Sequence, residues 1–115
     1  MGSLDDARAK LQDAALAQAL AVEADLAGQG NDALELAREA LKLDPKLTPA
    51  ALLAARLARG AGRSGMRDGI LKDAWNARPH PDLLRAALQD IENETPAAKA
   101  KRIADMTGTA TPVPE

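Results

Sequence analysis

The chain has 115 residues, a formal net charge of −2 and no cysteine, tyrosine or phenylalanine. This length allows one small domain, and the missing cysteines exclude disulfides, thiolate nucleophiles and cysteine-based zinc sites. Apolar residues are mainly 27 Ala and 17 Leu, whereas the β-branched and aromatic residues that favour strands are scarce. The composition therefore predicts an all-α protein.

The composition also argues against catalysis. His80 is the only histidine, so a metal site with two imidazoles is excluded and a catalytic triad is disfavoured. We predict that the protein is not an enzyme, and that it has no catalytic residue, metal site or cofactor. The small net charge implies no general attraction to nucleic acid or to an anionic membrane, and we expect neither as a partner of this segment.

The first half of the chain reads as two helices. Ser3 starts a capping-box pattern, and apolar residues at helical spacing predict one long helix ending near residue 26, before Gly28. A second helix is predicted over 32–43, because the residue before Pro45 disfavours helical backbone.

Two further helices are predicted in the middle of the chain. Thr48 and Pro49 form an N-cap followed by proline at the first helical position, which starts a helix over 48–59. The next helix is predicted over 64–77, although it contains two glycines that each cost about 1 kcal/mol against alanine.

Prolines mark the C-terminal elements. Pro81 and Pro96 each stand where a helix can begin, which predicts helices over 81–91 and 96–106. The helical domain would cover 1–107, and 108–115 would be a disordered tail.

An internal period of about 34 residues, the length of one helix pair, relates the helices. A shift by one period aligns small residues, turn glycines and closing prolines: Ala21 with Ala55, Gly28 with Gly62, Ala40 with Ala74, and Pro45 with Pro79. The period predicts two repeated helix pairs, at about 14–47 and 48–81, followed by a C-terminal helical pair at about 81–106.

This pattern resembles the tetratricopeptide repeat, in which helix pairs of this length stack on one another. The resemblance implies a right-handed helical solenoid of antiparallel helix pairs that binds a protein or peptide on its concave face. The family's aromatic positions hold mostly alanine here, and Arg67 stands where the family has a small residue.

A narrower likeness lies at the end of the second unit. The run from Asp73 to Leu83, followed by Glu94-Thr95-Pro96 and a basic helix, resembles the C-terminal part of HemY-type tetratricopeptide proteins. These proteins are associated with haem (protoporphyrin) biosynthesis and carry an N-terminal membrane anchor. The resemblance implies that this chain is the soluble portion of such a protein, on the cytoplasmic side of the bacterial inner membrane.

The repeat numbering assigns the groove positions of the first helix in each unit. These positions are expected to bind the partner's helix or extended peptide: Gln18, Val22, Asp25, Leu52, Arg56 and Arg59. The alternative is that Arg56 and Arg59 are simply solvated helix positions.

Charge is distributed unevenly between the two units. Residues 1–45 carry nine acids and four bases, a net of −5, whereas residues 46–79 carry seven bases and two acids, a net of +5. The units could simply attract each other. Alternatively, a basic ridge of Arg56, Arg59, Arg63 and Arg67 could hold an acidic partner, such as the propionates of a tetrapyrrole in a carrier or enzyme subunit.

Three further expectations concern single features. His80, between two prolines, is expected to be an N-cap or turn residue and not a haem ligand. Trp75 is expected to fill the junction between the last three helices. The exposed end of a short repeat array allows weak self-association through the alanine-rich first helix.

Overall fold

A computed structural model describes residues 3–88 and 94–108, and within these residues it contains six helices and no strand. The helices are α1 (Ser3–Leu26), α2 (Gly30–Leu43), α3 (Thr48–Gly60), α4 (Ser64–Ala77), α5 (Pro81–Leu88) and α6 (Pro96–Thr107). The prediction of an all-α protein is confirmed.

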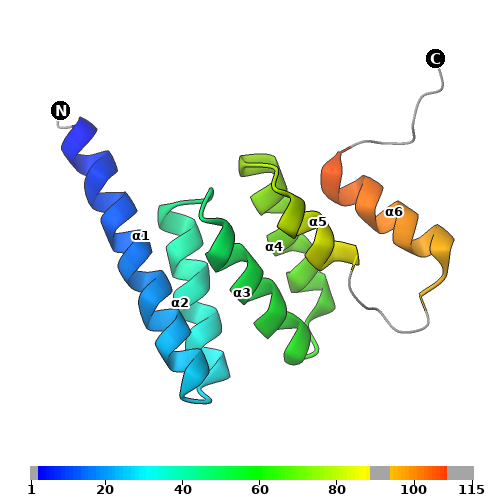
Figure 1. Cartoon of the computed structure of the whole chain (residues 1–115), viewed down its shortest axis with the longest axis horizontal. Coiled ribbons are helices and arrows are strands. Elements are labelled where there is room, and N and C mark those ends of the chain that lie inside the picture. The colour runs from blue at the N-terminus through cyan, green and yellow to red at the C-terminus, as the bar shows by residue number, and fades with distance from the viewer. Residues whose placement is uncertain (1–2, 89–93, 109–115) are drawn as a thin grey trace.

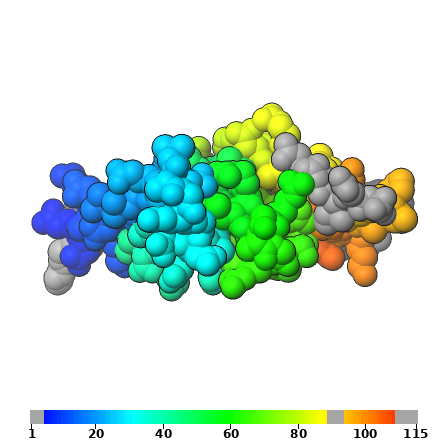
Figure 2. All heavy atoms as spheres, turned by 90° about the horizontal axis from the view of Figure 1, so that it is seen from below, coloured from blue at the N-terminus to red at the C-terminus, as the bar shows by residue number. Residues whose placement is uncertain are grey.

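The helices follow one another along the longest axis, from α1 at one end to α6 at the other (Figure 1). Each of α1 to α4 packs against the next in chain order, and α1 also contacts α3. Helix α5 packs on α3 and α4, and α6 packs on α4 and α5. The molecule is only 18 Å thick, which is about two helix diameters, and α5 stands out from one of its broad faces (Figure 2).

The turns after α1 and α3 have the same backbone conformation. Gly28 and Gly62 have φ of 78° and 77°, a left-handed conformation that favours glycine. The next amide in each turn donates to a carbonyl five residues back, Gln29 to Ala24 and Arg63 to Ala58, both at 2.8 Å. This bond satisfies a carbonyl that the helix end leaves open. The period of the sequence is therefore matched by the backbone conformation of these two turns.

Buried alanines line the helix contacts from α1 to α5. Their positions repeat with the same period: Ala17 and Ala51, Ala21 and Ala55, Ala24 and Ala58, and Ala40 and Ala74 are all buried. A methyl group at the contact lets two helix backbones approach closely, because less side chain stands between them. We call the contact of α1 and α2 with α3 the alanine seam.

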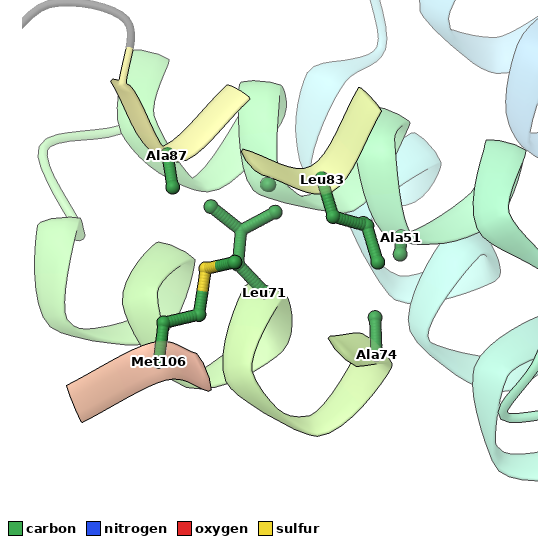
Figure 3. Packing of buried hydrophobic residues seen from close by; sticks show 7 residues of the cluster. Ala51, Leu71, Ala74, Leu83, Ala87 and Met106 are labelled. Atoms are coloured by element: carbon green, nitrogen blue, oxygen red, sulfur yellow. The ribbon is translucent and has the colours of Figure 1, made fainter. Parts of the chain in front are cut away.

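A different kind of core holds the last three helices. Leu71 of α4 and Leu83 of α5 are the largest fully buried side chains of the described residues. Leu71 lies against Met106 and Ala87, and Leu83 points toward Ala51 and Ala74 (Figure 3). Trp75, expected to fill this junction, is only half-buried and packs at the rim of the cluster.

A charged clamp fastens α6. The Nε and Nη2 atoms of Arg102 donate to the two carboxylate oxygens of Glu94 at 3.0 and 2.8 Å, and its Nη1 donates to the carbonyl of Ala87 in α5. The hydrogen bond from Arg102 holds the pKa of Glu94 below its ordinary value. At the start of α6, Thr95 is the N-cap, and its hydroxyl accepts from the Ala98 amide at 3.1 Å.

Several element boundaries differ from the prediction. Helix α2 begins at Gly30, two residues earlier than expected, and the N-cap of α3 is Leu47, so Thr48 is already helical and makes no capping bond. Helix α5 is described as far as Leu88. Its predicted continuation to 91 and the expected tail at 109–115 lie outside the described residues.

Candidate partner-binding face

The six predicted binding residues lie on α1 and α3, which contact each other. One ion pair joins the two helices: Arg56 Nη2 lies 2.6 Å from Asp25 Oδ2. The Arg56 side chain is 61% exposed and that of Asp25 24%. The structure therefore brings Asp25 and Arg56 together on an accessible surface, and we call the six residues with this pair at their centre the partner-binding face.

The apolar members of this face differ in accessibility. Val22 is 41% exposed and lies one helical turn from both Gln18 and Asp25. Leu52 is half-buried and packs against the cluster that contains Leu71 and Leu83. Val22 can therefore contact a partner, whereas much of the Leu52 side chain is already used in the core.

Gln18 contributes an unusual polar group. Its residue is half-buried, and its Oε1 atom is shielded from solvent without a hydrogen-bond partner among the described residues. A shielded acceptor that lacks a donor is destabilising. The partner-binding face therefore contains, at Gln18, a polar group that lowers the stability of the free chain.

The alternative of a basic ridge is wrong at Arg67. Arg67 is only 2% exposed, and its Nε and Nη2 both donate to Asp68 Oδ1, at 3.0 and 2.7 Å. It stands one repeat period after Ala33, which is fully buried, so the repeat directs this side chain inward. Arg56, Arg59 and Arg63 are exposed, but Arg56 is engaged with Asp25, as the attraction between oppositely charged units predicts.

Sequence reasoning missed most of the exposed apolar side chains. Six large hydrophobic residues of the described part are exposed, five of them on α1: Leu11, Leu16, Leu20, Val22, Leu26 and Leu88. At the helical period, Leu11, Val22 and Leu26 lie on one side of α1 and Leu16 and Leu20 on another. The sequence does contain a signal for these exposed side chains. Helix α1 carries apolar residues on all of its sides, whereas a surface helix needs only one apolar stripe.

His80 has the structural role that its sequence context predicts. Its Nδ1 atom accepts a hydrogen bond from the Asp82 amide at 3.0 Å, so the imidazole caps the first turn of α5. Within residues 3–88 and 94–108 no group of three or more potential metal ligands is present. In the same part of the chain, no helix combines the length and apolar character needed to cross a membrane.

We found no match to this chain among protein-family models, curated proteins or solved structures.

Proposed function

We propose that the protein is a non-catalytic interaction scaffold of the tetratricopeptide type. In this proposal α1–α2 and α3–α4 are two units of a right-handed solenoid, and α5–α6 is a C-terminal pair. The matching turns at Gly28 and Gly62 and the matching buried alanines support the two units. The partner is a helix or extended peptide of another protein, bound across α1 and α3.

The observation that carries this function is the mixed character of the partner-binding face. Val22 is exposed beside the Asp25–Arg56 ion pair, and Leu26, which is 82% exposed, lies next to Asp25. An apolar strip beside charges suits an amphipathic helix. Exposed ion pairs contribute only about 0.2–1 kcal/mol, so an acidic side chain of the partner can replace Asp25 at Arg56 at little cost.

The relation to haem biosynthesis is the second part of the proposal. It rests on the resemblance of the stretch from Asp73 to Leu83 to HemY-type proteins. In this view the scaffold serves haem-pathway proteins on the cytoplasmic side of the bacterial inner membrane, to which a longer parent protein is anchored.

Site-specific photo-crosslinking in the native host tests the scaffold. A photoreactive residue at position 22 should give discrete crosslinks to one or a few proteins, and Arg56→Glu should remove them. The matched control is the photoreactive residue at position 72, an exposed position on α4. Crosslinks that are equally frequent at both positions, or none at position 22, would refute a binding face on α1 and α3.

A haem and protoporphyrin titration tests the tetrapyrrole alternative. The scaffold predicts no saturable shift of the Soret band at micromolar ligand. A shift that is lost when Arg56→Ala and Arg59→Ala are combined would instead identify a carrier. The burial of Arg67 removes one of the four cations that the carrier would use.

A further inference from the structure

The outer side of α1 exposes leucines at positions that are covered in the next unit. Leu16 and Leu20 are 60% and 43% exposed, whereas Ala50 and Ala54, their counterparts one repeat period later, are fully buried. Both alanines cluster with buried residues of α2. Helix α1 stands at the end of the array (Figure 1), so its outer side corresponds to a side of α3 on which a helix packs.

The size of the exposed side chains indicates what kind of helix fits there. Within the array, α2 packs against alanine at positions 50 and 54. Leucine at positions 16 and 20 would hold a neighbouring helix farther from α1, because the distance between two helix axes depends on the side chains at the contact. The outer side of α1 therefore suits a separate amphipathic helix better than another unit of the alanine seam.

These leucines continue into a groove between α1 and α2. Four apolar side chains line it: Leu20, Ala24, Ala27 and Leu36. Along α1, the distance from Leu16 to Ala27 is roughly 16 Å, or about three turns of helix. We call this surface, Leu16 together with the groove, the outer groove. Its length matches a short helix laid along α1.

Acids outnumber bases around the outer groove. Its edges carry four carboxylates and two cations: Glu23, Asp32, Glu35, Glu39, Arg38 and Lys42. Lys42 Nζ already lies 3.8 Å from Glu39 Oε2. From residue 11 to its end at residue 26, α1 contains no base, and Asp13 lies on the same side as Leu16 and Leu20. The outer groove thus attracts basic groups and repels nucleic acid and anionic lipid.

We propose that the outer groove binds a basic amphipathic helix of another protein. The apolar side of that helix covers Leu16, Leu20 and Leu36, and its lysines or arginines lie beside the groove carboxylates. The partner-binding face lies on another side of α1, around Val22 and Asp25, so the inference does not depend on that face.

A synthetic leucine–lysine peptide of about four helical turns, with its leucines on one side, is the probe. Fluorescence anisotropy of the labelled peptide measures its Kd for the full chain. Two matched peptides are the controls: one has glutamate in place of lysine, and one has the same residues in scrambled order. We expect micromolar binding of the leucine–lysine peptide, and binding at least about tenfold weaker for both controls.

One pair of variants tests the apolar contact. Leu16→Gln combined with Leu20→Gln removes the leucines but keeps good helix formers, and should weaken binding at least about tenfold. The control combines Leu11→Gln with Leu26→Gln, which are exposed leucines on another side of α1, and should leave the Kd unchanged. Far-UV circular dichroism checks that each variant stays helical.

A second pair tests the charges. Glu35→Lys combined with Glu39→Lys should abolish binding of the leucine–lysine peptide and create binding of the leucine–glutamate peptide, because cations then outnumber carboxylates in the groove. The control combines Asp73→Lys with Asp105→Lys. It changes the net charge equally at exposed positions of α4 and α6, and should change neither affinity.

Several results would overturn the proposal. The native chain could fail to bind the leucine–lysine peptide, or the Asp73 and Asp105 control could weaken binding as much as the groove variant, which would show attraction by net charge alone. Loss of binding only in the Leu11 and Leu26 control would place the peptide on another side of α1. A native chain that sediments as a dimer, and as a monomer with Leu20→Gln, would identify a second copy as the occupant. If the Leu16 and Leu20 variant loses helix content, the exchange of peptide preference in the charge variant decides the question.

Discussion

The alanine seam and the C-terminal junction hold helices together by different means. In the seam, Ala21, Ala37 and Ala54 are each fully buried, and among the buried residues clustered with them only Leu34 and Leu53 are larger than alanine. In the junction, Leu71, Leu83 and Met106 fill the space among α4, α5 and α6, and Arg102, paired with Glu94, links the last helix to the Ala87 carbonyl of α5. The seam therefore depends on close backbone approach, whereas the junction depends on side-chain volume and one ion pair.

The largest effect is expected from removing volume at the junction. Leu83→Ala should lower the free energy of unfolding by about 2–5 kcal/mol, because a fully buried leucine leaves a cavity among α3, α4 and α5. Chemical denaturation measures the loss. A change below about 1 kcal/mol would mean that α5 does not pack as Figure 3 shows.

The seam should respond to added volume instead. Ala54→Leu should destabilise the chain by about 1–3 kcal/mol, because Ala54 is fully buried against α2 and the extra carbons must push the helices apart. Its control is Ala61→Leu, at an exposed position just after α3. Equal unfolding midpoints for the two variants in urea would contradict the tight seam.

The two glycine turns offer a direct comparison of the units. Gly28→Ala and Gly62→Ala should each cost about 1–2 kcal/mol, because both glycines have positive φ. An added Cβ meets no atom within 4 Å at either position, so the backbone conformation alone sets the cost. Thermal unfolding of both variants should therefore give the same loss, and clearly unequal losses would break the equivalence of the units.

The smallest effect is expected at the clamp and depends on pH. The pKa of Glu94 is lowered by its hydrogen bond with Arg102, so the clamp stabilises the fold fully above the ordinary glutamate pKa and loses this effect as pH falls through the lowered value. Hydrogen exchange should show α6 amides less protected in Glu94→Gln than in the native chain at pH 7. That difference should vanish in acid, and α1 and α2 amides should not respond at all.

Much of the fold could be predicted from local features of the sequence. The turn glycines at 28 and 62 follow from a backbone conformation that other residues adopt at a cost, and the prolines limit where helices continue. The repeat period then predicts which alanines face inward. Because the inward-facing positions of α4 follow the same period, α4 occupies its predicted range despite Gly65 and Gly69.

The site was predicted less well, because it depends on contacts between distant residues. Arg67 is close enough to Glu94 to help lower the pKa of that carboxyl, which requires the C-terminal pair to lie over α4. Leu52 is partly buried because it packs against the cluster that contains Leu83 of α5. The connection from α4 to α5 has three residues, one fewer than the four between α2 and α3. The repeat period was derived from the first two units, so it does not predict this shorter connection.

An interior made largely of alanine has a thermodynamic consequence. Each buried alanine withdraws less hydrocarbon from water than a leucine would, and the hydration of exposed hydrocarbon is what raises the heat capacity on unfolding. Alanine also has no rotamers to lose when it is buried. The N-terminal half of this protein should therefore have a broad, flat dependence of stability on temperature, and chilling should weaken it less than it weakens the leucine-filled end.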